Sequence, residues 1–343
     1  MEMFVEFKHG DSTDPYTLVD VPPRTPPESA YSTLTRIHSN LSRQHALQFR
    51  TWTFAVGVFG KVARILRCDR SGILLTTAID YSTEEGNRQL TEFFLRLDRM
   101  ADGPEARGWD PTVDDATEEE ADRLSELIKA FGQSTPDLGR RVTRLQKKKA
   151  AGEPGLHPAF RNLVGTVGDL TQFPRKKMSV MDGDVSKHYI IGCHSIVSKG
   201  LAGRATRGFV AMSMETKGLV FLKETWRADV AGVPPEHYWY ERLLSNRSNG
   251  GMENIGTYSH GSDVYATKRI VRCSDTKQRT ISHLYTNQPP QTNAIRYVRY
   301  RIVYSELYVS LLTFRDSKHL SSVMLDIAQG MLFHVHLTSL LTS

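Results

Sequence analysis

Three glycines, a lysine and a glutamate in the second half of the chain have the types and the order of a phosphate-binding site. The glycines form the pattern Gly200-x-x-Gly203-x-x-x-x-Gly208 between two expected strands. Lys223 ends the next expected strand, and Glu236 opens the helix expected after it. Glycine lets backbone N–H groups approach a phosphate closely, and a lysine on a strand neutralises phosphate charge. Each feature alone is weak, because a strand lysine is usually a solvated charge, and only their order favours the site.

Glu236 is the most informative of these residues, because of its place on the expected helix. Glu236, Tyr240, Leu243 and Leu244 follow the spacing of a single helical face, so the carboxylate lies on an apolar, sheet-facing stripe. An unpaired carboxylate there would be costly. Two interpretations stay open: Glu236 lies at the exposed first turn as a favourable N-terminal charge, or it meets a cation, for which Lys223 is the natural candidate.

The first part of the chain predicts an arm followed by a small mixed domain. Residues 1–46 combine several prolines with polar residues and show no sustained period, which predicts a mobile arm with one short helix from Ser32. Alternating apolar residues from Thr51, followed by the turn Asp69-Arg70-Ser71-Gly72, predict a hairpin or small meander. We expect these strands to open an α+β domain over residues 47–150.

Three helices are expected within this domain. One carries Leu90, Phe93, Phe94 and Leu97 at helical spacing, and a second opens with the capping box Thr117-x-x-Glu120. The third begins at Pro136 and ends in the basic run between Arg140 and Lys149. We interpret this run as a solvated helix end, with a phosphate-backbone or acidic-partner patch as the alternative.

The remaining chain is divided into a linker, a second domain and a tail. Residues 151–187 form the expected linker and residues 188–328 the second domain, which begins with three antiparallel strands. Residues 329–343 form an atypical tail, since no Asp, Glu, Lys or Arg occurs from Ile327 to Ser343. The predicted fold class is therefore α+β, a mixed domain followed by an antiparallel sheet with one helix.

Composition excludes several classes of protein and ligand site. The 343 residues suggest about two domains, and no apolar run is long enough to cross a membrane. The N-terminus lacks the pattern of a signal peptide, so we expect an intracellular protein, cytoplasmic or nuclear. Three scattered cysteines predict neither disulfides nor a metal site. A net charge of +6 is too small for this length to argue for nucleic acid, and the substrate, protein partner and oligomeric state stay open.

Beyond these patterns, the sequence resembles the fungal-type protein kinase family over roughly residues 45–328. The motifs that carry the resemblance are ordered along the chain. They are Phe54 through Asp69-Arg70-Ser71-Gly72, Arg107-Gly108-Trp109-Asp110-Pro111-Thr112, Gly203-Arg204-Ala205-Thr206-Arg207, Leu222-Lys223-Glu224-Thr225-Trp226-Arg227, Pro235-Glu236-His237 through Glu241-Arg242-Leu243, Tyr300-Arg301-Ile302-Val303 and Phe314-Arg315-Asp316-Ser317-Lys318-His319-Leu320.

The resemblance implies a kinase-like amino-terminal lobe that binds ATP. It places Gly203 in the phosphate loop, makes Lys223 the phosphate-binding lysine and makes Glu236 its helix partner. It also implies that the hinge that meets adenine lies around Tyr304 to Leu307 and includes Tyr304 and Glu306. An intact member would transfer phosphate to protein Ser or Thr with Mg²⁺.

The sequence departs from the family pattern after Lys318, where no H-R-D-type catalytic loop follows. Without the catalytic and metal-binding aspartates we expect no phosphoryl transfer, no catalytic residue and no Mg²⁺ site in this chain. The alternative function is non-catalytic, a nucleotide-binding pseudokinase or a protein-interaction module.

Overall fold

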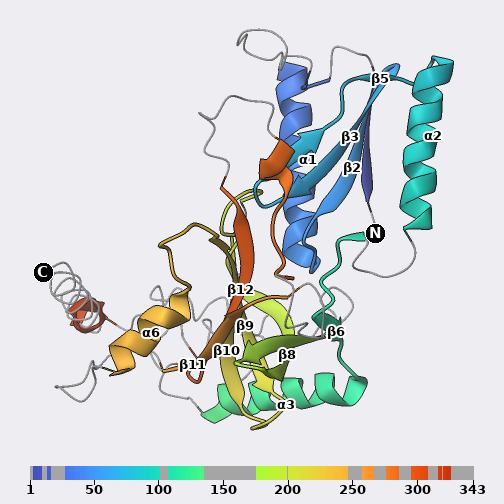
Figure 1. Ribbon diagram of the computed structural model, residues 1–343. Coiled ribbons are helices and arrows are strands. Elements are labelled where there is room, and N and C mark those ends of the chain that lie inside the picture. Colours follow the sequence, from blue (N-terminus) through green and yellow to red (C-terminus); the bar gives the residue numbers. More distant parts are fainter. Residues whose placement is uncertain are drawn as a thin grey trace, which may run out of the picture.

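The computed structural model shows an α+β protein built on two sheets (Figure 1). It describes residues 3–9, 14–16, 28–100, 107–134, 175–198, 200–245, 257–265, 276–285, 295–307, 316–318 and 320–325. The predicted fold class is therefore right at the level of α+β. The helix expected from Pro136 and the tail 329–343 lie outside the described residues.

The first sheet follows the order β1-β2-β3-β4, with β5 paired to β3. Its strands are β1 (Phe4–Lys8), β2 (Thr53–Phe59), β3 (Val62–Asp69), β4 (Gly72–Leu75) and β5 (Ile79–Asp80). β2, β3 and β4 form the expected antiparallel meander, in which Gly60 turns the chain with a φ of +58°. β1 pairs with β2 in parallel, with Phe4 opposite Ala55.

Two helices cover opposite faces of this sheet (Figure 1). Helix α1 (Glu28–Leu47) places Ile37 and Leu41 against Ala55 and Leu66, which are fully buried. Helix α2 (Glu84–Arg99) begins after the N-cap Thr83, whose hydroxyl accepts a hydrogen bond from the Gly86 N–H. Because adjacent strand residues point to opposite faces, the α2 ring of Phe93 meets Phe54 rather than Ala55.

The prediction of a mobile arm over residues 1–46 is wrong. β1 is a strand of the first sheet, and α1 has 20 residues instead of forming a short helix from Ser32. Three apolar side chains, Leu34, Ile37 and Leu41, have helical spacing and pack into the core of this domain. The many polar residues between them concealed this period in the sequence.

The second sheet is antiparallel and has the order β11-β12-β10-β9-β8-β7-β6. The strands are β6 (Val113–Asp115), β7 (Lys176–Asp182), β8 (Val185–Val197), β9 (Arg207–Ser213), β10 (Leu219–Ala228), β11 (Tyr258–Asp263) and β12 (Tyr297–Tyr304). The three antiparallel strands expected at its start are β8, β9 and β10.

This sheet curls so that strands β7 and β11 approach each other. The Met181 N–H of β7 donates to Ser262 Oγ of β11 at 3.2 Å, and the Tyr189 hydroxyl lies 3.2 Å from His260 Nε2. The inner face is closed by an apolar cluster of buried residues: Met178, Val180, Tyr189, Ile191, Phe209, Ala211, Leu222 and Val303. Lys223, next to Leu222 in β10, therefore points to the outer face.

Two helices pack on the outer face. Helix α3 (Glu118–Ser134) buries Leu124 and Ile128 against Ile190 and Met212, and α6 (Glu236–Ser245) lies against β12 and β11 through Tyr240. The predicted capping box of α3 is confirmed, because the Glu120 N–H donates to Thr117 Oγ1 and the Thr117 N–H donates to Glu120 Oε2. A short 3-10 helix, η6 (Ser282–Tyr285), precedes β12.

The boundaries expected between the two domains differ from the structure. β6 and α3 lie within residues 47–150 but are part of the second domain. β6 pairs with β7, and α3 packs on the second sheet. β7 itself and the first residues of β8 fall inside the expected linker 151–187. The Gly, Pro and polar residues of this region predicted a linker between the domains. Instead, β7 is a strand next to the edge of the second sheet, and its Met178 and Val180 are buried.

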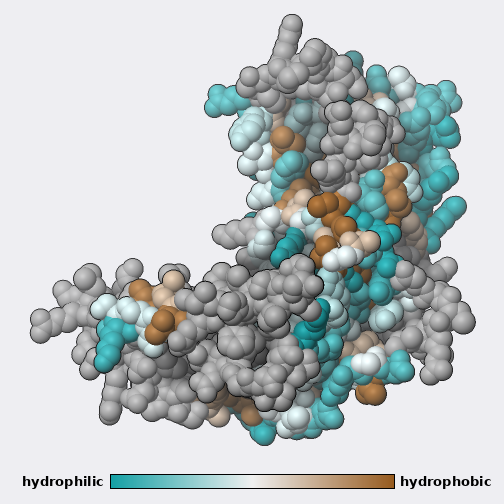
Figure 2. All heavy atoms as spheres, turned by 60° about the vertical axis from the view of Figure 1, so that its left-hand side comes forward, coloured by the Kyte–Doolittle hydropathy of each residue, from teal (hydrophilic) through white to brown (hydrophobic). Residues whose placement is uncertain are grey.

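None of the helices in the described part of the chain is long and apolar enough to span a membrane. On the face drawn in Figure 2, the described hydrophobic residues form small patches between hydrophilic ones. Such scattered apolar residues are normal for a protein surface.

His45, near the end of α1, makes the stability of the protein dependent on pH. Burial first, and then the charges of Arg70, Arg299 and Arg207, hold its pKa well below the ordinary value. The folded chain keeps His45 neutral, while the unfolded chain protonates it near pH 6.5. The contribution of His45 to the free energy of unfolding is therefore fully present above this pH. It is lost as the pH falls, by at most about 1.4 kcal/mol per pH unit.

We expect urea unfolding between pH 7.5 and 5.5 to show this loss, and His45→Gln to reduce its slope. The exposed His9 provides a matched control, since His9→Gln should leave the slope unchanged. Equal slopes for His45→Gln and the wild type would contradict a buried, neutral His45.

Candidate functional site

Lys223 and Glu236 form an ion pair on the outer face of the second sheet. Lys223 Nζ lies 2.8 Å from Glu236 Oε1 and 2.7 Å from Oε2, and the two side chains are 27% and 26% exposed. Glu236 is the first residue of α6, so it lies in the first turn and also meets the cation. Both alternatives that the sequence left open for Glu236 therefore hold together. The ammonium group is fixed in place yet accessible to a ligand.

Tyrosine hydroxyl groups hold α6 and its glutamate against the sheet. The Tyr304 hydroxyl donates to Glu236 Oε1 at 2.8 Å, and burial followed by the Glu236 charge raises the pKa of Tyr304. The His237 backbone N–H donates to the Tyr300 hydroxyl at 3.0 Å. The orientation of Glu236, and through it that of Lys223, thus depends on β12.

The glycine loop between β8 and β9 leads into β9, which pairs with the strand β10 that carries Lys223. Gly208 is opposite Lys223 in this ladder, so it is the glycine nearest to the lysine along the sheet. Gly203 has a φ of +90° and donates its N–H to the Arg70 carbonyl of the first domain at 2.9 Å. The guanidinium of Arg70 in turn donates to the carbonyls of Gly200 and Leu201 at 2.9 and 3.0 Å. The loop is docked on the β3–β4 turn.

The β3–β4 turn also links the two domains, through the side chain of Asp69. Its carboxylate accepts hydrogen bonds from the backbone N–H groups of Ile281 and Ser282, both at 2.9 Å, and from that of Ser71 at 2.8 Å. Arg67 completes its partners at 3.2 Å. The residues expected only to turn a hairpin therefore also form the junction between the domains.

A buried charge cluster supports the inner face of the second sheet. Glu224 accepts from Arg207, Arg299 and Arg301, and Asp110 accepts from Arg299 and Arg301. Burial by itself would raise the pKa of Glu224, but the three arginines lower it far below the ordinary range. All five side chains are at least 95% buried. The motif residue Asp110 thus carries a structural role.

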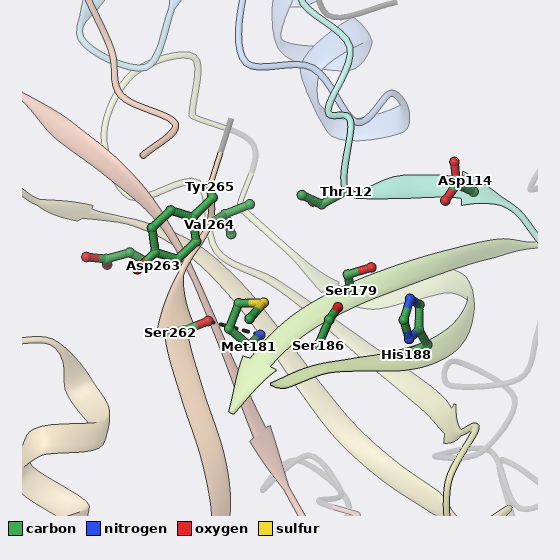
Figure 3. Close-up of a pocket in the computed structure, with 10 residues that line it drawn as sticks. All are labelled: Thr112, Asp114, Ser179, Met181, Ser186, His188, Ser262, Asp263, Val264 and Tyr265. Carbon is green, nitrogen blue, oxygen red and sulfur yellow. Dashed lines mark hydrogen bonds between the residues drawn. The ribbon is translucent and has the colours of Figure 1, made fainter. Parts of the chain in front are cut away.

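A separate cavity of about 290 Å³ lies between β7, β8 and β11. Figure 3 shows Ser179, Ser186 and His188 on one side of it and residues 262–265 on the other. Its lining is rich in hydroxyl groups, and it contains none of the residues predicted for a phosphate site.

The structure brings together three of the five predicted site residues, Lys223, Glu236 and Tyr304. Gly203 is held by the first domain, and Glu306 accepts from the Thr257 N–H and hydroxyl at 3.2 and 2.8 Å instead of joining the group. The backbone of Tyr304 lies in the ladder between Phe221 and Tyr258. Of the predicted hinge, residues 304–307 are described, and the segment from 308 to 315 lies outside the described residues.

The sequence did not predict the residues that support this site from the opposite face of the sheet. Glu224 follows Lys223 directly and points to the opposite face, where it binds arginines of β9 and β12. One signal for these residues was available in the sequence. In two neighbouring strands, charged residues of opposite sign alternate with apolar ones. Arg299 and Arg301 in the strand Tyr297–Tyr304 show this alternation.

No protein-family model, curated protein or solved structure matches the chain.

Proposed function

We propose that the second domain is a protein-kinase-like amino-terminal lobe of the fungal type and that Lys223, held by Glu236, binds the phosphates of ATP. The proposal is for nucleotide binding without phosphoryl transfer by the residues of this sequence, which has no H-R-D-type motif after Lys318. Transfer to a protein Ser or Thr would require that motif and Mg²⁺.

The observation that carries the proposal is the Lys223–Glu236 pair within its sheet. In protein kinases a glycine loop joins two strands, a lysine on the third strand pairs with a glutamate of the following helix, and the lysine binds phosphates. Here the loop joins β8 and β9, Lys223 lies on β10, and Glu236 opens α6. These elements adjoin in the order β11-β12-β10-β9-β8, which sets the loop beyond Gly208 and near the lysine.

One observation favours a second candidate, a domain that binds a protein and no nucleotide. The Gly203 N–H, which a phosphate loop would offer to its ligand, is used by the Arg70 carbonyl. A phosphate group would have to displace this hydrogen bond. Under this candidate, the Lys223–Glu236 pair only positions α6.

Titration of the whole chain with a fluorescent ATP analogue, with and without Mg²⁺, separates the two candidates. We expect Lys223→Ala to weaken binding about 10-fold to 100-fold, because a charge-assisted hydrogen bond contributes about 1.5–3 kcal/mol. Glu236→Gln should weaken it less, since the lysine keeps its charge but loses its ionic partner. Both side chains are partly exposed, and circular dichroism of each variant should match that of the wild type.

Lys129→Ala is the matched control, because Lys129 is an exposed lysine of α3 and its loss removes the same charge. It should bind the analogue like the wild type. Equal affinities of Lys223→Ala and Lys129→Ala, or no binding by the wild type, would reject the nucleotide proposal in favour of the protein-interaction candidate.

A further inference from the structure

Strand β1 forms an edge of the first sheet that no other described strand covers. The sheet order places β2 on one side of β1 and no described strand on the other (Figure 1). Free edges promote pairing with another chain, and proteins usually block them with prolines, bulges or charged side chains. β1 contains no proline, and its pairing with β2 runs without a register shift from Phe4 to Lys8. It is therefore a regular strand that can accept a further strand.

The backbone groups on the free side of β1 belong to Val5 and Phe7. Lys8 is bound to β2, since its carbonyl accepts from the Gly60 N–H at 3.1 Å. The N–H and C=O of a strand residue point to the same side, and successive residues alternate. Glu6 and Lys8 therefore face β2, whereas the backbone of Val5 and Phe7 faces outward and bonds to no described residue.

Val5 and Phe7 also give this edge an exposed apolar surface, since their side chains are 37% and 71% exposed. Because side chains alternate between faces, they lie on the face opposite to Phe4, which packs into the core of this domain with α1. No charged side chain of β1 lies on that face. Glu6 and Lys8 share the α1 face with Phe4, and Lys8 Nζ lies 3.7 Å from Glu6 Oε1.

We propose that β1 pairs in antiparallel fashion with β1 of a second copy of this chain, around a two-fold axis at Phe7. In this register the outward N–H and C=O of Phe7 bond to those of the partner's Phe7. Glu6 lies opposite the partner's Lys8, on the same face of the joined sheet, and opposite charges at such positions are favourable. A pair centred at Glu6 would instead oppose two carboxylates, so charge selects the register at Phe7.

The short strand limits the strength of this contact. Two paired five-residue strands bury less than the roughly 1,200 Å² of a stable interface, so we expect a dissociation constant of about 10–100 μM. The contact lies in the first domain and does not depend on nucleotide binding at Lys223.

Sedimentation velocity of the whole chain from about 1 to about 300 μM tests the dimer. The wild type should change from monomer to dimer over this range. Phe7→Asp opposes two carboxylates at the axis and should weaken association at least about 10-fold. Leu284→Asp is the matched control, because Leu284 is 69% exposed and its helix η6 contacts β4, at the opposite edge of the sheet. A monomeric wild type at the highest concentration, or equal association of the two variants, would overturn the proposal.

Charge reversal tests the register. Glu6→Lys and Lys8→Glu each oppose like charges across the axis, so each variant should associate more weakly than the wild type. A mixture of the two should form heterodimers in native mass spectrometry, because an acidic strand then meets a basic one. A mixture of folded variants that associates no better than either variant alone would reject this register.

Hydrogen exchange of the wild type, measured residue by residue, needs no variant. The outward amides of Val5 and Phe7 should exchange more slowly as the protein concentration rises. The amides of Glu6 and Lys8 face β2 and provide the internal comparison, with little expected change. Exchange at Val5 and Phe7 that does not depend on concentration would contradict pairing at this edge.

Discussion

Glu224→Gln is expected to lower the free energy of unfolding by about 3–5 kcal/mol. The substitution preserves the shape of the side chain but removes the charge that Arg207, Arg299 and Arg301 share. These guanidinium groups cannot reach water from the inner face, so breaking the network leaves buried charges unpaired. Urea unfolding followed by tryptophan fluorescence measures the loss.

Glu215→Gln is the control for this experiment. Glu215 is 67% exposed and lies 3.4 Å from Lys187 at the surface. Its replacement should change stability by no more than about 0.5 kcal/mol. A loss at Glu224 as small as that at Glu215 would show that the buried cluster is not formed.

Asp69→Asn is expected to loosen the junction between the domains and to cost about 3 kcal/mol. An amide cannot accept as strongly as the carboxylate, and its NH₂ group would face the N–H groups of Ile281 or Ser282. Hydrogen bonds to a charged partner contribute about 1.5–3 kcal/mol each, and leaving a buried donor unpaired costs a similar amount. Hydrogen exchange should show faster exchange at residues 280–282, and calorimetry should resolve two unfolding transitions.

Asp98→Asn, on the exposed side of α2, provides the comparison for this change. It should leave both the exchange pattern and the calorimetric profile of the wild type unaltered. Unchanged protection of Ile281 and Ser282 in Asp69→Asn would contradict the role of Asp69 as the link between the domains.

The sequence predicts the elements whose signals are local. The capping box of Thr117 and Glu120, the meander that begins near Thr53, and the strand that carries Lys223 all depend on residues close in the chain. Helical spacing and the cost of a buried carboxylate made a Lys223 ion pair one of two interpretations of Glu236, and the structure forms this pair. These features need no knowledge of distant contacts.

The sequence could not predict the features that depend on long-range pairing. β1 joins the first sheet by pairing in parallel with β2, about 50 residues later in the chain, and no local pattern shows this. Gly203 was expected in a phosphate loop, but its N–H binds a carbonyl far away in the sequence. Asp110 meets its partners Arg299 and Arg301, which lie 189 and 191 residues away in the chain.

Labelling with an ATP derivative that carries an acyl group on its terminal phosphate tests the central proposal most directly. A lysine amine beside the bound phosphates attacks the acyl carbon, which forms an amide and releases ATP, and mass spectrometry identifies the acylated residue. We predict that Lys223 is labelled first and that excess ATP protects it. Labelling spread over exposed lysines such as Lys129, with no protection of Lys223 by ATP, would contradict nucleotide binding at this site.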